Sequence, residues 1–546
     1  MVVDDMGATA AIHPRPVVLP MCSYNSARCK IQAQAFCREM YRSLHSMYFR
    51  LFIQSKVCYV KQHVTNMRFP RVSLFVLFID FQSAAIMNLI SRVRTCLIWS
   101  VFLVFRGGES SGNFWHITDL HWDPTYKLGD DPTLVCNSSG SRPAQKAGRF
   151  GDYLCDSPWD LINSSIYAMK SILPDPDFIL WTGDETPHVP NEYLGEEAVV
   201  SIIGNLTQLI KEVFPTTKVY AALGNHDYHP KSQLPPGQNY IYNQTAEMWK
   251  QWLDPESQSL FKIGGYYTEK LLNRPGYRIL VLNTNLYYDQ NKATQDIPDP
   301  ANQFNWMDTI LTNAASQNEK VYIVGHVPPG YFEKKRSKMW FRPNFNERYL
   351  ELIQKHHAVI EGQFFGHHHT DCFRMFYSPD GLSPIGTMFL SPGVTPWKTT
   401  LPGVVDGANN PGIRTFEYDT DSLLVKDMVT YYLNLTYANM AQARWEKEYR
   451  LTEAFRVPDA SPTSMNMILD RMTQESCVLQ KYYELNSVSY DLSACDADCR
   501  LDHVCAARGI DEKSYNECLN RAPPNGLFVM LLPVLSATLS IAWSSL

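Results

Sequence analysis

Short polar motifs that combine carboxylate, imidazole and carboxamide side chains occur five times along the chain. They read DLH at 119–121, GD at 183–184, GNHD at 224–227, GH at 325–326 and GHHH at 366–369. None of the five contains cysteine, and such oxygen and nitrogen donors suit two divalent ions that assist a hydrolysis. A single GD or GH pair has no predictive value, whereas five motifs in order predict a metal-dependent hydrolase.

Each motif directly follows a short apolar run that we expect to form a β-strand. The expected strands are residues 114–118, 178–181, 219–223, 279–282, 321–324 and 364–365, and the expected helices are residues 160–173, 196–214 and 304–316. This alternation is typical of an α/β domain with a sheet at its core. The loops at the carboxyl ends of such strands form one crevice, so five separated motifs can converge there. Glycine beside the polar residues lets the backbone turn sharply and approach an ion.

The overall composition is that of a folded protein without an excess of positive charge. Hydrophobic residues make up 45% of the 546 residues, and 49 basic side chains stand against 55 acidic ones. This hydrophobic content is enough for a sizeable core and excludes wholesale disorder. Proteins that bind nucleic acid usually carry strong positive charge, so we expect no nucleic-acid polymer as a partner.

The first 86 residues differ in character from the rest of the chain. They hold ten Lys and Arg and four Asp and Glu, a net charge of +6, which leaves 39 minus 51, or −12, for residues 87–546. From Met87 the chain shows two arginines, a mostly apolar run at 95–105 and then small residues, the outline of a secretory signal peptide. We therefore expect residues 87–112 to be a signal peptide and residues 1–86 to be an upstream extension outside the mature protein. The alternative is a basic cytosolic tail before an N-terminal anchor.

Cysteines and glycosylation sequons also indicate a protein that enters the secretory pathway. Eight of the 13 cysteines lie beyond residue 112, an even number that favours disulfides in a secreted chain. The expected pairs are Cys136–Cys155, Cys495–Cys499 and Cys505–Cys518. Cys372 and Cys477 remain as a further pair or as two free thiols, and a zinc site is the alternative for the C-terminal cysteines. The Asn-x-Ser/Thr sequons expected to be glycosylated are at Asn137, Asn163, Asn205, Asn243 and Asn434.

The chain ends in an uncharged, largely apolar stretch at 527–546 with no basic residue after it. A membrane-spanning helix is normally followed by Lys or Arg on its cytoplasmic side, so this tail is more typical of a GPI-attachment signal. We place that signal at 519–546 and expect the protein on the extracellular face of the plasma membrane, with secretion as a second destination. A C-terminal helix packed on the domain is the alternative, which prolines near 523 and 533 disfavour.

The motif order DxH, GD, GNH(D/E), GH and GHxH resembles that of the calcineurin-like metallophosphoesterases. Six longer runs are similar to those of the acid sphingomyelinase-like phosphodiesterases: FWHITDLHWDP, DFILWTGDETPHVP, YAALGNHDYHP, YIVGHVPPG, GQFFGHHHTD and SPGVTPWK. The resemblance covers about residues 113–518. It implies an α/β fold, a metallophosphoesterase-type β-sandwich flanked by helices at 113–437, with a small disulfide-stapled helical subdomain at 438–518. The saposin domain of acid sphingomyelinase itself is absent, and residues 1–86 match nothing in the family.

The resemblance also implies two zinc ions per chain, bridged by one aspartate. The ligands implied for one ion are Asp119, His121, Asp184 and His369, and those for the other are Asp184, Asn225, His326 and His367. A hydroxide held between the ions would attack phosphorus in line. His226 and His188 would stand near the leaving oxygen, where either acts as general acid or only orients the phosphate. Asp227 would hold His226 in position.

Together these features predict a hydrolase acting on phosphoric diester bonds. The substrates expected are soluble nucleotide-type or phosphocholine-type molecules with phosphodiester or phosphoanhydride bonds, and a monomer is expected. Protein phosphatases of this fold usually show GDxxDRG, whereas residues 183–188 read GDETPH without arginine, which argues against that class. Two alternatives stay open: a sphingomyelin or phospholipid phosphodiesterase, and a lipid-binding surface regulator whose catalysis is secondary. The missing saposin domain disfavours efficient sphingomyelin cleavage.

Overall fold

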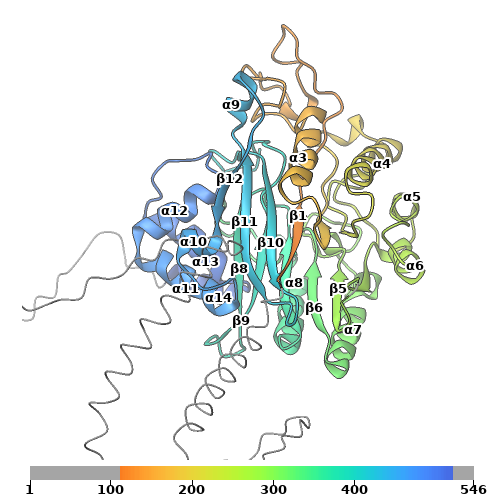
Figure 1. Cartoon of the computed structure of the whole chain (residues 1–546), viewed down its shortest axis with the longest axis vertical. Helices are drawn as coiled ribbons and strands as arrows, with labels where there is room; N and C mark the ends of the chain where they lie inside the picture. Colours follow the sequence, from red (N-terminus) through yellow and green to blue (C-terminus); the bar gives the residue numbers. More distant parts are fainter. Residues whose placement is uncertain (1–110, 273, 521–546) are drawn as a thin grey trace, which may run out of the picture. The chain divides into compact units, whose positions relative to one another are not determined.

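Two six-stranded β-sheets lie at the centre of the described residues (Figure 1). The first has the strand order β12-β11-β10-β1-β2-β3 and the second the order β4-β5-β6-β7-β9-β8. The computed structural model describes residues 111–272 and 274–520. The predicted upstream extension at 1–86, nearly all of the predicted signal peptide and the apolar end of the predicted GPI signal therefore lie outside the described residues.

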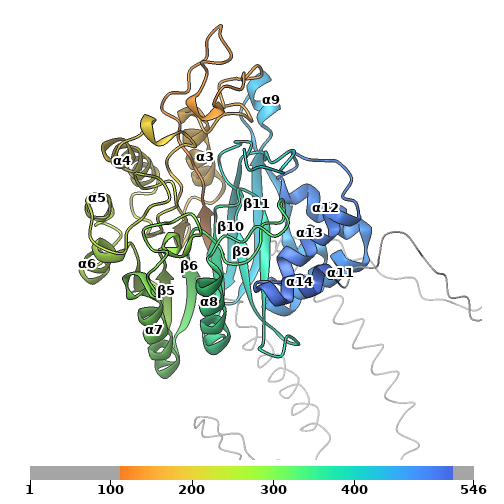
Figure 2. The ribbon, with the colours of Figure 1, turned by 180° about the vertical axis from the view of Figure 1, so that it is seen from behind.

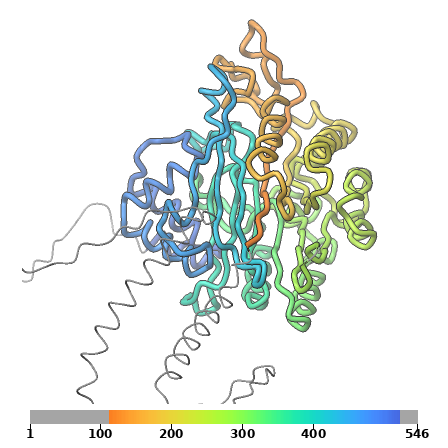
Figure 3. Tube along the Cα trace, in the orientation of Figure 1, coloured from red at the N-terminus to blue at the C-terminus, as the bar shows by residue number. Residues whose placement is uncertain are grey.

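Both sheets combine a group of parallel strands with antiparallel strands. The strands of the first sheet are β1 (Ser111–Ile117), β2 (Phe178–Trp181), β3 (Val219–Ala221), β10 (Gly412–Asp419), β11 (Val425–Leu433) and β12 (Trp445–Arg450). The strands of the second are β4 (Tyr267–Lys270), β5 (Tyr277–Val281), β6 (Lys320–Val324), β7 (Ile360–Phe365), β8 (Cys372–Tyr377) and β9 (Pro384–Leu390). Strands β1, β2 and β3 are parallel to one another, as are β5, β6, β7 and β9. The remaining strands pair in antiparallel register, so β10, late in the chain, lies beside β1, the first described strand (Figure 3).

Aromatic rings join the inner faces of the sheets. The ring of Phe114 in β1 stacks on that of Phe178 in β2, with 4.6 Å between centroids, and meets Phe364 of β7 edge-on at 5.3 Å. The central strands are buried on both faces, so they appear in the sequence as continuous apolar runs rather than alternating ones. This is why all six predicted strands are confirmed, as β1, β2, β3, β5, β6 and β7.

Helices cover the outer faces of the sandwich (Figure 2). The three predicted helices are confirmed as α3 (Trp159–Ile172), α4 (Glu196–Val213) and α7 (Gln303–Gln317). Three more helices of this part of the chain are α5 (Tyr240–Met248), α6 (Pro255–Gly264) and α8 (Pro343–His356). The expected fold class, an α/β metallophosphoesterase-type sandwich, is thus the one observed.

The C-terminal segment is helical except at its start. Its helices are α9 (Leu435–Met440), α10 (Leu451–Phe455), α11 (Pro462–Gln474), α12 (Ser476–Asn486), α13 (Ala497–Arg508) and α14 (Glu512–Asn520), and α11 and α13 pack on β8 and β9. The sequence-based expectation of a wholly helical segment at 438–518 is wrong for β12, which pairs with β11 at the edge of the first sheet. The charged residues of β12 explain the error, because edge strands carry charge that central strands cannot.

All three predicted disulfides are present, joining Cys136 to Cys155, Cys495 to Cys499 and Cys505 to Cys518. The two cysteines left open by the sequence are both free thiols, Cys372 buried and Cys477 exposed. Of the five sequon asparagines, Asn137, Asn205 and Asn434 are exposed and the other two are half-buried. Among the described helices none is both long enough and apolar enough to cross a membrane.

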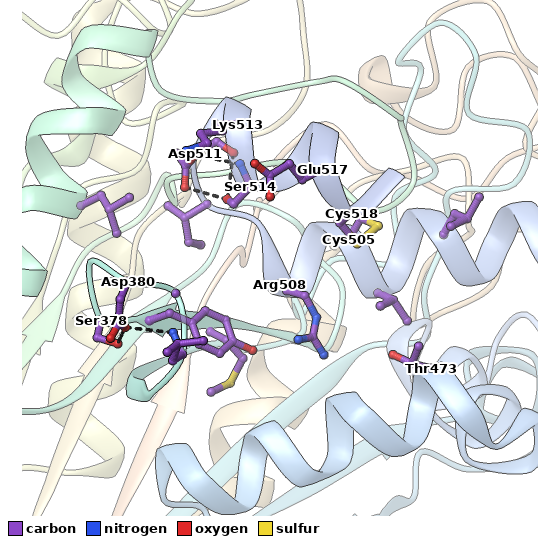
Figure 4. A pocket seen from close by; sticks show the side chains of 18 of the residues that line it. Ser378, Asp380, Thr473, Cys505, Arg508, Asp511, Lys513, Ser514, Glu517 and Cys518 are labelled. Atoms are coloured by element: carbon purple, nitrogen blue, oxygen red, sulfur yellow. Dashed lines mark hydrogen bonds between the residues drawn. A yellow bond between two sulfur atoms is a disulfide. The ribbon is translucent and has the colours of Figure 1, made fainter. Parts of the chain in front are cut away.

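A cavity of about 1110 Å³ lies between the C-terminal helices and the hairpin that joins β8 to β9. Figure 4 shows the Cys505–Cys518 disulfide and Arg508 on one side of it and Ser378 and Asp380 of the hairpin on the other. None of its lining residues belongs to the five polar motifs. Its size therefore does not make it the reactive site, which lies elsewhere in the fold.

Candidate active site

The five polar motifs meet at the carboxyl ends of β1, β2, β3, β6 and β7. Backbone hydrogen bonds tie their loops together: Asp119 N donates to Gly183 O at 2.9 Å and His121 N to Asp184 O at 3.0 Å. Glycine makes this approach feasible, since a Cβ on Gly183 would lie 2.2 Å from Gly224 N, and Gly183 also has a positive φ of 87°. The convergence predicted from strand order is therefore present.

Asp119, His121 and His369 form one group of possible metal ligands. Their ligand atoms all lie within 4.8 Å of one another. Asp119 Oδ1 is 3.4 Å from His369 Nε2 and 3.8 Å from His121 Nε2. All three side chains are buried.

Asp184, His326 and His367 form a second group with the same spacing. Asp184 Oδ2 is 3.1 Å from His326 Nε2, and Asn225 Oδ1 is 3.2 Å from the same nitrogen. Asp184 Oδ2 is also 3.5 Å from His121 Nε2 in the first group. Asp184 therefore stands between the two groups, as the predicted bridging ligand would.

Backbone carbonyls fix the orientation of two of the imidazoles. His121 Nδ1 is 2.6 Å from Thr186 O, and His326 Nδ1 is 2.6 Å from Thr182 O. A carbonyl only accepts, so each Nδ1 carries the proton and each Nε2 lone pair faces the other donors. His121 Nε2 and His367 Nε2 are buried without a hydrogen-bond partner. Such orphaned nitrogens indicate a place for a cation.

Five of the seven predicted ligands adopt left-handed backbone conformations. Their φ angles are 51° for Asp119, 41° for His121, 61° for Asp184, 73° for His367 and 60° for His369. For residues with a Cβ this conformation costs roughly 1–3 kcal/mol each and clusters at functional sites. These left-handed conformations direct the five side chains toward one another.

The electrostatics of the cluster also fit bound cations. Burial favours a neutral His121 ring, but the nearby carboxylates of Asp119 and Asp184 outweigh it and raise the pKa of His121 to about 9. Burial also favours the neutral form of His326, but the charge of Asp184 outweighs this effect and raises the pKa of His326 to about 9. The two buried carboxylates thus demand positive charge, which protons supply when no metal does. The donor set of three carboxylate or amide side chains and four imidazoles fits two divalent metal ions.

His188 and His226 lie beside this centre, as expected for groups near a leaving oxygen. The His188 ring centroid is 4.1 Å from that of His121 and 4.3 Å from that of His226. His188 also stacks on the indole of Trp397 at 3.7 Å. Burial and neighbouring His121 lower the pKa of His188 well below its ordinary value, and burial does the same for the pKa of His226.

Asp156 is a functional residue that the sequence analysis missed. Its Oδ1 lies 2.9 Å from His188 Nδ1, and its Oδ2 accepts from the His188 backbone amide at 2.6 Å. Thr395 Oγ1 donates to it as well, at 3.0 Å. No strand or glycine marks Asp156 in the sequence, because it lies in the long disulfide-closed loop between β1 and α3. Only the fold brings it to His188.

The expected role of Asp227 in holding His226 is wrong. The Asp227 carboxylate is buried and accepts from the backbone amides of Gly224 at 2.7 Å, Asp184 at 2.8 Å and Glu185 at 2.7 Å. The His226 ring instead has Nδ1 at 3.3 Å from the carbonyl of Pro187. Asp227 therefore joins the loops after β2 and β3 and acts on the site through the backbone.

Another group of ligand-type side chains, Glu333, His368 and Cys372, is already satisfied by protein contacts. The Arg374 guanidinium donates to Glu333 Oε2 at 2.8 Å, which removes the need for a metal there. Trp340 Nε1 donates to His368 Nε2 at 2.7 Å, and His368 Nδ1 is 3.2 Å from Glu333 Oε2. His368 thus points away from the ligands that flank it, as expected.

A cavity of about 300 Å³ opens onto these two groups of possible metal ligands. Its walls include His188, His226 and three aromatic side chains, Tyr288, Trp340 and Trp397. The Trp340 ring meets His367 edge-on with 4.4 Å between centroids. A ligand in this cavity would reach both predicted metal positions and both candidate acids.

Comparison with known proteins agrees with this site. The calcineurin-like phosphoesterase family model matches residues 112–371, and the acid sphingomyelin phosphodiesterase C-terminal region matches residues 383–524. The chain belongs to the acid sphingomyelinase-like phosphodiesterase family and is a hydrolase acting on phosphodiester bonds.

Among its relatives are the acid sphingomyelinase-like phosphodiesterases 3b of Mus musculus and Homo sapiens. The mouse protein is 60% identical over 444 residues, which cover 80% of this chain and 96% of the relative. The human protein is 61% identical over 427 residues, which cover 78% of this chain and 94% of the relative. The Homo sapiens cyclic GMP-AMP phosphodiesterase SMPDL3A is 43% identical over 413 residues, 75% of this chain and 90% of the relative.

Proposed function

We propose that the protein is a two-zinc phosphodiesterase of the outer cell surface. Its substrates are soluble molecules with a phosphodiester or phosphoanhydride bond, of the nucleotide or the phosphocholine type. The observation that carries this proposal is Asp184, whose Oδ2 lies 3.1 Å from an imidazole of one donor group and 3.5 Å from an imidazole of the other. A carboxylate shared in this way supports two ions rather than one.

The ions, when bound, supply Lewis acidity and an activated water for attack on phosphorus. Asp119, His121, Asp184 and His369 would hold one ion, and Asp184, Asn225, His326 and His367 the other. The substrate phosphate would lie in the cavity that His188 and His226 line. A sphingomyelin-type substrate and a lipid-binding regulator with secondary catalysis remain the competing proposals.

The histidines that line the cavity handle the proton of the leaving group. Asp156 accepts from His188 Nδ1, which leaves His188 Nε2 as the nitrogen that would take up a proton and pass it to the leaving oxygen in the cavity. Stacking on Trp397 fixes the plane of the His188 ring. His226 lies 4.3 Å away between ring centroids and is the second candidate donor.

The test compares hydrolysis of bis-p-nitrophenyl phosphate and p-nitrophenyl phosphate by the glycosylated ectodomain, residues 113–520. Chelation should abolish activity and zinc should restore it, with a preference for the diester. Asp184→Asn is the matched variant, since it removes the shared charge while keeping the side-chain size. A folded, zinc-loaded protein that hydrolyses neither ester would favour the regulator instead.

The location forms part of the same proposal. The signal-like segment at 87–112, the sequons and the apolar tail at 519–546 support a glycosylated, GPI-anchored product. None of the five sequon asparagines is buried, so each can accept a glycan. N-terminal sequencing of the cell-surface product should give a start near residue 113, and a GPI-specific phospholipase should release it. A start before residue 87 would contradict the proposed signal peptide.

A further inference from the structure

One lysine in the wall of the reactive cavity has no partner among the residues that the structure describes. Lys334 is half-buried and lines the cavity together with Phe332 and Trp340. Its ammonium group makes no hydrogen bond or ion pair with any described residue. An ammonium group in a protein ordinarily finds an acceptor. Burial lowers the pKa of Lys334, and the charges of Glu333, Asp491 and Asp406 offset only part of this effect.

The neighbouring basic residues show that this is a particular property of Lys334. Lys335 donates to the carbonyl of Pro402, and the Arg336 guanidinium donates to Asp502 at 2.6 Å. Lys338 pairs with Asp289 at 2.5 Å and lies over the Trp340 ring. Of the four basic side chains in this segment, three are engaged by other protein groups, and Lys334 is the one that lines the cavity.

The carboxylates around Lys334 are committed to other groups. Glu333 accepts from Arg374 at 2.8 Å, and Asp406 pairs with Lys398 at 2.8 Å. Asp491 accepts from the Tyr483 hydroxyl at 2.6 Å. Each acid acts on Lys334 through its field but none forms a salt bridge with it.

The cavity wall has few charged side chains besides Lys334. Among the described residues that line this cavity, Asp184 is the one carboxylate, and Lys334 is the one lysine or arginine. Asp184 is occupied by the imidazoles of the predicted metal centre, so it does not neutralise a ligand near Lys334. The wall that Lys334 forms therefore favours an anion and repels a cation.

We propose that Lys334 is a specificity-determining residue that binds a second anionic group of the substrate, beyond the phosphate that is cleaved. This inference rests on the proposed phosphodiesterase function and makes its substrate class more specific. A second phosphate, as in a phosphoanhydride, would be attracted by the positive charge of Lys334. The trimethylammonium group of a phosphocholine substrate would be repelled by it.

The test uses competitive inhibition of bis-p-nitrophenyl phosphate hydrolysis by AMP, ADP and phosphocholine at a buffered free zinc concentration. In the wild-type ectodomain ADP should bind about 10-fold or more tightly than AMP, the effect of one charge-assisted hydrogen bond. Lys334→Met should bring the ADP to AMP ratio close to one, and Lys334→Arg should restore most of it. Lys334→Glu should weaken ADP further and strengthen phosphocholine, which a purely structural role of Lys334 does not predict.

Lys250→Met is the matched control, because Lys250 is exposed on the surface away from the cavity. It should keep the wild-type ratio. An ADP to AMP ratio that survives in Lys334→Met, or that falls equally in Lys250→Met, would overturn the inference and leave the phosphodiesterase proposal standing. Wild-type protein that hydrolyses no diester with zinc bound would instead overturn the proposed function, and the inference with it.

Discussion

Replacing Asp227 should disrupt the metal centre through the backbone rather than through proton transfer. Three buried amides, those of Gly224, Asp184 and Glu185, donate to the Asp227 carboxylate at 2.7–2.8 Å. Hydrogen bonds to a charged acceptor are each worth about 1.5–3 kcal/mol, so the three sum to about 4–9 kcal/mol before allowance for non-additivity. This is a large part of the roughly 5–15 kcal/mol that stabilises a typical protein.

Asparagine keeps one acceptor oxygen and places an amide donor against backbone donors. We therefore expect Asp227→Asn to lose about half of that energy, roughly 2–4 kcal/mol, and Asp227→Ala to fail to accumulate. Urea unfolding of the ectodomain followed by fluorescence measures the loss, and elemental analysis measures bound zinc in the same samples. Asp175→Asn is the control, since the Asp175 side chain is 94% exposed and should change stability by less than about 0.5 kcal/mol.

Asp227→Asn would refute this reasoning if it kept wild-type stability and zinc but lost activity with a shifted pH profile. That result would return Asp227 to the role of orienting His226. The structure gives the opposite expectation, in which stability and zinc content fall together and the pH profile of the remaining activity is unchanged.

Three further predictions follow from other contacts. Asp156→Asn should lower kcat by about 10-fold or more and move the basic limb of the pH–rate profile to lower pH, because His188 loses the charge that stabilises its protonated form; unchanged profiles would exclude this role. Burial lowers the pKa of His116 to about 3, so the unfolded chain binds one more proton below pH 6.5, and stability should fall by about 1.4 kcal/mol per pH unit between about 6.5 and 3. Urea unfolding measured at several pH values gives the slope of the unfolding free energy against pH. In His116→Gln this slope should be smaller by the contribution of one proton, and equal slopes in the two proteins would contradict the lowered pKa of His116. Glu333→Gln should cost about 3–5 kcal/mol because it leaves the buried Arg374 without its carboxylate, and the double change with Arg374→Met should recover part of this, which thermal unfolding of the set can measure.

The parts of the fold that sequence reasoning predicted are those with strong local signals. Strands buried on both faces, such as β2 (Phe178–Trp181), are uninterrupted apolar runs, and the polar motif after each run marks the edge of the sheet. Strand β12 (Trp445–Arg450) was missed because an exposed edge strand carries charges and resembles a polar helix. Only the three-dimensional structure shows that β12 is a strand, through its pairing with β11.

The predicted metal ligands share one local signal, a polar residue directly after a strand, and the structure brings all seven together. Asp156 and Lys334 had no such signal. Asp156 meets His188 only because the long loop after β1 folds back over the site. Nothing in the local sequence distinguishes Lys334, which lines the cavity, from the adjacent Lys335. Asp227 was misassigned because sequence proximity to His226 says nothing about backbone hydrogen bonds from neighbouring loops.

Counting zinc per chain tests the central claim most directly. The wild-type ectodomain, loaded with zinc and freed of excess metal, should contain two zinc ions per chain by elemental analysis, and diester hydrolysis should appear only as the second ion binds. Asp184→Asn should hold one ion or none and lack activity, because both donor groups share the Asp184 carboxylate. Full diester hydrolysis with one zinc per chain, or two ions retained in Asp184→Asn, would contradict the account.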